Sequence, residues 1–197
     1  VFFLARILGA LYFINNINED DLVKRCRRAL WGNTALFLVF FLAFVIRTLL
    51  ADGYAVRPET GEVFMEPYKY LTNFLQMPVV LLVFLVGVVA VLWGIIRTLW
   101  KPAFDKGIWF AGAGTVVTVL ALLLVAGYNN TAYYPSTHDL QSSLTLANSC
   151  SSQFTLKVMA YVSILVPFVL AYIFYAWRSI DNRKIDAKEM EEGGHAY

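Results

Sequence analysis

Few side chains in this chain of 197 residues have the types that ligate haem: two His, two Cys and four Met. Its two histidines are His138 and His195, and neither lies within a hydrophobic segment. A membrane bundle that binds haem needs an axial His, Met or Cys at membrane depth. Met77 and Met159 lie near the starts of hydrophobic segments, where packing is their ordinary role. We therefore predict no metal site, no directly bound haem and no catalytic residue in this chain.

The two cysteines, Cys26 and Cys150, do not form the CxxC pattern of thiol–disulfide enzymes. The distribution of basic residues described below places them on opposite sides of a membrane, so they cannot pair with each other. A membrane thiol oxidoreductase is therefore disfavoured, and both cysteines are interpreted as packing or neutral positions.

Four charged residues lie within or beside hydrophobic segments and are candidates for partner or lipid contact: Arg6, Arg47, Asp52 and Lys157. Arg6 is about eight residues, or ~12 Å at the helical rise, from the inner end of its segment. A charge at that depth is expected to face a bundle interior, a cavity or a partner. Arg47 and Lys157 lie close to segment ends, so their long side chains can also reach the membrane surface.

The composition indicates the elements that must position these residues. Hydrophobic residues make up 59% of the chain and charged residues 15%, with a mean hydropathy of +0.60. Soluble domains carry roughly 25% charged residues, and about 20 apolar residues cross a bilayer as a helix. Four segments have such a length: Thr34–Ala51, Met77–Ile96, Gly107–Tyr128 and Val158–Trp177. We therefore predict an all-α integral membrane bundle with four complete transmembrane helices and one truncated N-terminal helix.

The truncated helix is predicted from VFFLARILGALYFI, the hydrophobic sequence with which the chain opens. A signal peptide would carry its basic residues before the apolar core, whereas Arg6 interrupts it. We expect this stretch to be the second half of a transmembrane helix, and the chain to be the C-terminal portion of a longer protein. Residues 1–178 are expected to form one helical bundle, and residues 179–197 a cytoplasmic tail.

The basic residues predict a topology. The five segments 15–32, 52–75, 97–106, 129–153 and 178–197 carry four, two, three, no and four Lys or Arg residues respectively. Cytoplasmic loops of membrane proteins carry the excess of Lys and Arg. The first, third and last segments are therefore predicted to face the cytoplasm, together with the C-terminus.

The connecting segments also carry local signals. NINEDDLVKRCRR is interpreted as a linker with a short helical piece, and residues 52–75 as an ordered outer loop with turns at Asp52-Gly53 and Thr60-Gly61. Small residues permit close helix packing in membranes. Those that we expect at helix contacts are Gly87, Gly94, Ala111, Gly112, Ala113 and Gly114.

Several motifs occur in a fixed order along the chain. They are GALYF (Gly9–Phe13), DDLVKRCRRA, ADGYAV (Ala51–Val56), YYPST (Tyr133–Thr137), SLTLANSCSSQFTLKVM (Ser143–Met159) and LVPFVLAY (Leu165–Tyr172). In this order and spacing the chain resembles the second half of subunit II of cytochrome bd ubiquinol oxidase. It departs from that pattern at Asn148, where relatives tend to carry an acid, so a charge role at this position is in doubt.

The resemblance implies a fold and a role. The whole subunit would form two four-helix bundles plus a peripheral helix, and would pair with a haem-bearing subunit I. That partner would carry two haems b and one haem d and oxidise quinol, coupled to the reduction of oxygen to water. Subunit II would be a stabilising partner, and in some relatives it holds a quinone in a hydrophobic crevice.

The expected partners of this chain are therefore subunit I, the N-terminal half of subunit II, membrane lipids and a quinone, with no nucleic acid. The expected location is the bacterial inner membrane. A small transporter or channel subunit is the alternative. It requires polar groups that line a path through the membrane, and within the hydrophobic segments only Arg6 fits that requirement.

Overall fold

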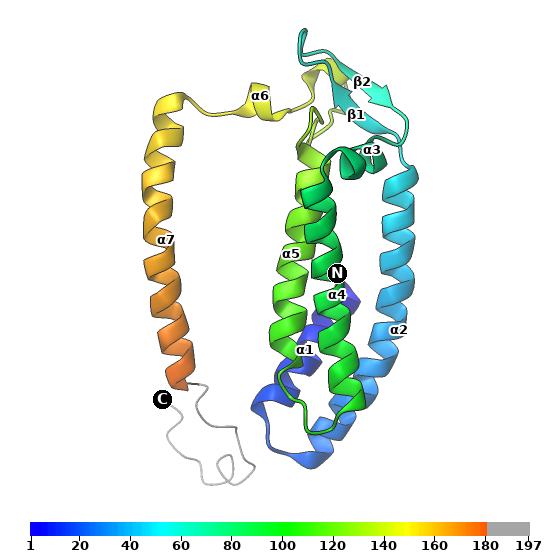
Figure 1. Cartoon of the computed structure of the whole chain (residues 1–197), viewed down its shortest axis with the longest axis vertical. Helices are drawn as coiled ribbons and strands as arrows, with labels where there is room; N and C mark the ends of the chain where they lie inside the picture. The colour runs from blue at the N-terminus through cyan, green and yellow to red at the C-terminus, as the bar shows by residue number, and fades with distance from the viewer. Residues whose placement is uncertain (181–197) are drawn as a thin grey trace.

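The computed structural model describes residues 1–180; most of the predicted tail, with His195, lies outside the described residues. The described elements are α1 (Phe2–Asn16), α2 (Asp20–Leu50), β1 (Gly53–Val56), β2 (Val63–Glu66), α3 (Lys69–Gln76), α4 (Pro78–Trp100), α5 (Gly107–Gly127), the 3-10 helix η1 (Leu140–Ser142), α6 (Leu146–Ser149) and α7 (Gln153–Ile180). In Figure 1, α1, α2, α4 and α5 form a bundle, and α7 stands apart from it.

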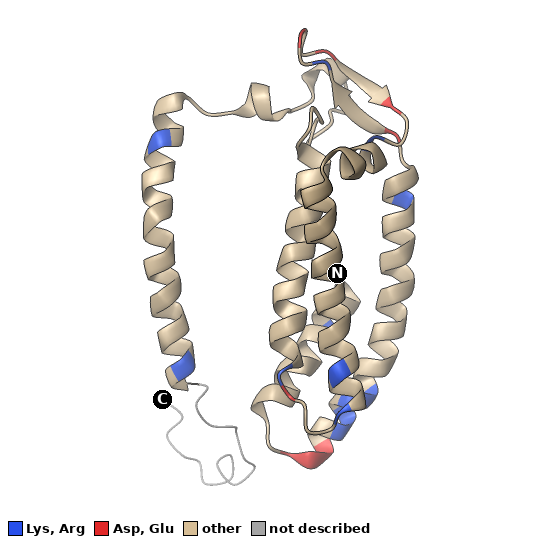
Figure 2. Cartoon of the chain, in the orientation of Figure 1, with Lys and Arg blue, Asp and Glu red and all other residues tan. Residues whose placement is uncertain are grey.

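The predicted fold class is confirmed. Four described helices, α2, α4, α5 and α7, are long and apolar enough to cross a membrane, and α1 is a shorter apolar helix. One end of the bundle carries the α1–α2 and α4–α5 turns, and Figure 2 shows Lys and Arg gathered there. We call it the basic end. The opposite end carries β1, β2 and α3, and we call it the hairpin end.

The helix α2 corrects the interpretation of the segment before it. The stretch from Asp20 onward is one continuous helix of 31 residues with the span that follows. Asp20 and Asp21 lie in its first turn, where carboxylates favour the helix N-terminus, and Lys24 pairs with Asp21 at 3.7 Å. No proline interrupts the helix before Leu50, so the predicted linker is reduced to residues 17–19.

The predicted outer loop contains an antiparallel hairpin of β1 and β2, followed by α3. Gly61 makes its turn with a φ of 72°, as predicted. The turn predicted at Asp52-Gly53 is wrong, because Gly53 begins β1 and pairs with Glu66. A Cβ at Gly53 would lie 2.5 Å from the Cβ of Lys69, so glycine is needed there for the close approach of α3.

The bundle is held together by a seam between α4 and α5. Gly87 and Gly94 on α4 face Gly114 and Gly107 on α5, and each glycine lies against backbone of the other helix. A Cβ at Gly94 would lie 2.7 Å from the carbonyl oxygen of Gly107. The predicted contact positions Gly87, Gly94, Ala111 and Gly114 are confirmed. Gly112 is not at the contact, because a Cβ there would meet nothing within 4 Å.

The helix α7 differs from the bundle helices because it does not pack against them. It has 28 residues, and none of them is buried against the rest of the described chain. A linker that contains η1 and α6 connects it to the hairpin end (Figure 1). A helix that is apolar on all sides belongs in a membrane or in the core of a larger assembly.

Candidate functional site

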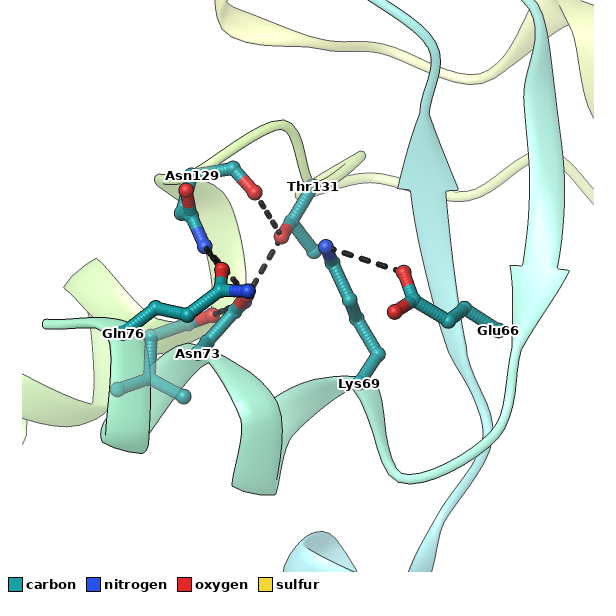
Figure 3. Close-up of polar contacts among 7 residues, drawn as sticks. Glu66, Lys69, Asn73, Gln76, Asn129 and Thr131 are labelled. Atoms are coloured by element: carbon teal, nitrogen blue, oxygen red, sulfur yellow. Dashed lines mark hydrogen bonds and ion pairs between the residues drawn. The ribbon is translucent and has the colours of Figure 1, made fainter.

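At the hairpin end, Asn73 of α3 is the centre of a buried polar network (Figure 3). Its side chain is fully buried, and its amide donates to the carbonyl oxygen of Val125 at 2.9 Å and to Oγ1 of Thr131 at 2.8 Å. Asn129 donates to the Asn73 oxygen at 3.1 Å and to Gln76 at 2.6 Å. Val125 is in the last turn of α5, whose carbonyl groups lack helical partners. Asn73 therefore caps α5 from a neighbouring helix.

The chain leaves α5 in a conformation that suits this cap. Asn129 and Asn130 have φ values of 55° and 53°, a left-handed backbone that asparagine tolerates better than most residues. Thr131 then forms a bridge with Ala55 of β1. Lys69 is 6% exposed and pairs with Glu66 at 3.2 Å, which ties α3 to β2. The hairpin, α3 and the exit of α5 are thus joined by polar contacts.

Tyr70 lies beside this network on α3. Burial, and to a smaller extent neighbouring Tyr54, raises the pKa of its phenol. The phenol therefore remains protonated and uncharged at neutral pH, which suits a position packed against the apolar cluster of Phe74 and Phe84.

At the basic end, Arg27 of α2 connects to the α4–α5 turn. Its guanidinium donates to the carbonyl oxygens of Thr98, Pro102 and Phe104, the last two at 2.8 and 3.4 Å. Thr98 is in the last turn of α4, so this arginine satisfies a carbonyl group that the helix leaves free. Arg27 was counted in the sequence only as a topogenic charge, and it serves here as a clamp between helices.

We expect Arg27→Gln to lower the free energy of unfolding by about 1–3 kcal/mol, because hydrogen bonds from a charged donor are lost. Thermal unfolding in detergent, followed by tryptophan fluorescence, measures the effect. Arg28→Gln is the matched control, because Arg28 is exposed and makes no hydrogen bond or ion pair within residues 1–180. Equal midpoints for the two variants would contradict the clamp.

The four predicted contact residues lie at separate places and do not converge on one site. Arg6 is exposed on α1, with its guanidinium over the Phe2 ring at 5.6 Å from the centroid. Arg47 is exposed in the last turn of α2, and Asp52 is exposed just beyond it. Lys157 is exposed near the start of α7. Each remains a candidate for contact with lipid or with another chain.

The polar sequence that leads into α7 is an ordered helix entry. Thr145 and Asn148 form a reciprocal capping box at α6. Ser152 accepts a hydrogen bond from the backbone N–H of Thr155 at 3.4 Å and so caps the start of α7. Its hydroxyl lies 3.0 Å from the Thr155 hydroxyl. The side chains here bond to one another and to nearby backbone, as those of a structural connection do.

A crevice of about 440 Å³ opens among α1, α2, α4 and α5. Its walls are mainly aromatic and aliphatic, including Phe37 and Phe41. The hydroxyls of its two threonines, Thr115 and Thr118, donate to the carbonyl groups of Ala111 and Gly114 in their own helix, both at 2.7 Å. The crevice therefore suits an apolar chain better than a polar head group.

The residues of haem-ligating type among residues 1–180 lie on separate elements and do not converge. His138, the histidine among residues 1–180, is exposed in the linker after α5. No group of three His, Cys, Asp or Glu side chains in this part of the chain could hold a metal ion. Met159 lies on the exposed helix α7, and Met77 precedes α4.

Some functional residues were not singled out from the sequence. Asn73 lies in a segment interpreted as a loop, and the groups to which it donates hydrogen bonds are more than fifty positions away. Gly107 was placed within a span, yet it faces Gly94 at the seam. Arg25 was counted only as a basic charge, and it lines a groove with Arg6. The sequence held no clear signal for Asn73, because a single asparagine in a predicted outer loop can bond to water as well as to protein.

The fold and its surfaces define a class: a multi-pass helical membrane protein with exposed apolar helix faces and exposed cations. The family model for cytochrome bd terminal oxidase subunit II matches residues 1–180, and the chain belongs to this family. The resemblance read from the ordered motifs is thereby confirmed.

Curated relatives agree with this membership. The chain is 29% identical over 155 residues to cytochrome bd-I ubiquinol oxidase subunit 2 of Escherichia coli strain K12, and equally to that of Escherichia coli O157:H7. The aligned residues are 78% of this chain and 39% of each relative. The chain therefore spans less than half the length of the relatives that it matches.

Proposed function

We propose that this chain forms a non-haem-ligating part of subunit II in a cytochrome bd-type quinol oxidase. In this role it packs against a haem-bearing subunit I and supports quinol oxidation coupled to the reduction of oxygen to water. The observation that carries the proposal is α7, a membrane-length helix of 28 residues with none buried in the described chain. Family membership over residues 1–180 supports the same role.

The proposal assigns contacts to the exposed surfaces. The outward faces of α7, together with Lys157, Arg47, Asp52 and Arg6, would contact subunit I, the rest of subunit II or lipid. Residues 1–178 would act as one transmembrane unit, followed by a tail from residue 179. By the excess of Lys and Arg in cytoplasmic loops, the basic end and the C-terminus would face the cytoplasm of a bacterial inner membrane.

The quinone of this proposal would place its isoprenoid tail in the apolar crevice among α1, α2, α4 and α5. The lining favours the tail over the quinone ring, because the threonine hydroxyls already donate to backbone. The ring would lie outside this crevice. The haems b and d of the proposed complex would belong to the partner subunit.

A transporter or channel subunit is less well supported. Such a protein needs polar groups along a path within the bundle. The buried threonines Thr98 and Thr118 bond to carbonyl groups of their own helices. Thr34 Oγ1 is the single buried side-chain oxygen or nitrogen without a partner among residues 1–180. One hydroxyl does not form a path.

Co-purification tests the proposed function. The protein is extracted from its native membrane through an affinity tag on this chain, and the absorption spectrum and bound quinone of the preparation are measured. We expect a second polypeptide with haem b and haem d absorption in equimolar amount, together with quinol oxidase activity. A preparation without haem absorption would contradict the oxidase role, and haem stoichiometrically bound to this chain alone would contradict its non-ligating role.

A further inference from the structure

A groove of about 350 Å³ runs between α1 and α2 toward the basic end. Its volume is within the ~300–1,000 Å³ of small-ligand sites. Arg6 lines it from α1 and Arg25 from α2. Two cations from different helices therefore border one open groove on the surface of a membrane bundle. Figure 2 shows this end of the bundle as the place where basic residues gather.

Neither of these cations has an acidic partner within residues 1–180. The ion pair of this helix end joins Lys24 to Asp21, and the guanidinium of Arg27 is bound to carbonyl groups of the α4–α5 region. Arg6 lies over the Phe2 ring, and a ring does not neutralise a positive charge. The groove thus carries two positive charges without a negative one from the described chain.

The depth of the two cations differs in a way that suits a lipid. The helices α1 and α2 are joined by residues 17–19 and run in opposite directions (Figure 1). Arg25 is in the second turn of α2, before the hydrophobic part of that helix. On α1, Phe13 lines the part of the groove nearest the basic end. Arg6 is seven residues before Phe13, which places it about 10 Å further from that end along the helix. A cation at that depth requires a counter-charge.

Small residues keep the groove open. Gly9, Ala10 and Ala29 form part of its lining, and a Cβ at Gly9 would meet nothing within 4 Å. Phe13 supplies an apolar wall beside them. A phosphate with an attached glycerol and acyl chain can therefore enter from the membrane side, with the phosphate toward the guanidinium groups and the chain along the apolar wall.

We propose that the groove between α1 and α2 binds the phosphate group of an anionic phospholipid, with Arg25 and Arg6 as its ligands. Basic pockets between transmembrane helices near one membrane surface recognise anionic head groups in this way. A protein carboxylate would satisfy the charge as well, but the groove is open on one side and has an apolar wall at Phe13, which suits a ligand that carries an acyl chain beside its phosphate. The inference depends on the membrane class of the chain and is independent of the proposed oxidase function.

The experiment uses the whole complex purified through a tag on this chain and depleted of lipid by washing in detergent. Phosphatidylglycerol and phosphatidylcholine with the same acyl chains are titrated, and bound lipid is counted by native mass spectrometry. We expect the wild type to bind phosphatidylglycerol about tenfold more tightly than phosphatidylcholine, and the Arg6→Gln/Arg25→Gln variant to lose this preference. Arg28→Gln is the matched control and should retain it, because Arg28 does not line the groove.

Two further variants separate the site from general charge and from misfolding. Arg6→Lys/Arg25→Lys keeps both charges and should retain most of the preference. Gly9→Leu fills the groove without changing charge and should weaken phosphatidylglycerol binding. Equal affinity of the wild type for the two lipids, or an equal loss in Arg28→Gln, would overturn the proposal.

The source of the phosphate is tested in the same preparation. Inorganic phosphate and glycerol 3-phosphate are offered as competitors, and we expect neither to displace phosphatidylglycerol at millimolar concentration. Displacement by either would show a site for free phosphate and would overturn the lipid assignment. Loss of a protein subunit from the Arg6→Gln/Arg25→Gln complex, with lipid binding unchanged, would assign the counter-charge to a protein and would also overturn it.

Discussion

Gly94→Ala is expected to lower the free energy of unfolding by about 2 kcal/mol or more, because the added methyl group has no space at the α4–α5 seam. Its Cβ would lie 2.7 Å from the carbonyl oxygen of Gly107 and 2.9 Å from the backbone nitrogen of Ala111. Both atoms are backbone, so no flexible side chain can move away. The two helices would have to separate along their contact.

The loss should be measurable against a substitution of the same kind. In Gly112→Ala, on α5, the new Cβ would meet nothing within 4 Å. Alanine is favoured over glycine in a helix by about 1 kcal/mol, so this control should be neutral or more stable than the wild type. Thermal unfolding in detergent and the yield of assembled complex are the two measurements. If Gly94→Ala unfolds at the same temperature as Gly112→Ala, the seam does not hold the helices together.

The seam also shows what the sequence could predict. The small residues on the two segments predicted close helix contact, and length and hydropathy located α4 and α5 almost to their ends. Sequence alone could not say which glycines face the partner, because Gly112 and Gly114 differ only in their angle around one helix. That angle is set by the packing of α5 against α1 as well as α4, which is a property of the folded bundle.

The start of α2 was not predicted for a different reason. Six of the nine residues from Asp20 to Arg28 are charged, and a hydropathy criterion stops at the first charged residue. Helix formation requires no apolar side chains, and an acidic first turn with a following ion pair favours it. The helix therefore extends beyond the hydrocarbon region into the surface layer, where Arg25 and Arg27 acquire separate roles.

The sequence predicted which charged residues are candidates for contacts, but it could not predict which residues come together to form a site. Arg6 was recognised because it is a charge inside an apolar segment. Its neighbour Arg25 is nineteen positions away and belongs to the next helix, so the groove exists only once α1 and α2 are packed. In the same way, length and hydropathy predicted the membrane span within α7, whereas the isolation of α7 from the bundle is visible only in three dimensions.

Asn73→Leu should lower the free energy of unfolding by about 3 kcal/mol, because it removes the central member of a buried network and three hydrogen bonds with it. The Val125 carbonyl would lose its donor, and the Asn129 amide would lose one acceptor. Leucine has a similar volume, so the loss comes from hydrogen bonding and little from packing. The hairpin end should open first, which limited proteolysis of the β1–β2 hairpin would detect.

Two further variants identify the cause. Gln76→Leu removes the exposed edge of the same network and should cost less than about 1 kcal/mol. In the double variant Asn73→Leu/Thr131→Val, both partners of the 2.8 Å hydrogen bond are apolar, so the bond that each single variant breaks is lost only once. The loss of unfolding free energy in the double variant should therefore be smaller than the sum of the losses in the two single variants. Thermal unfolding of the four proteins of this double-mutant cycle measures the difference. Strict additivity, or an Asn73→Leu protein as stable as Gln76→Leu, would show that Asn73 does not hold the α5 exit to α3.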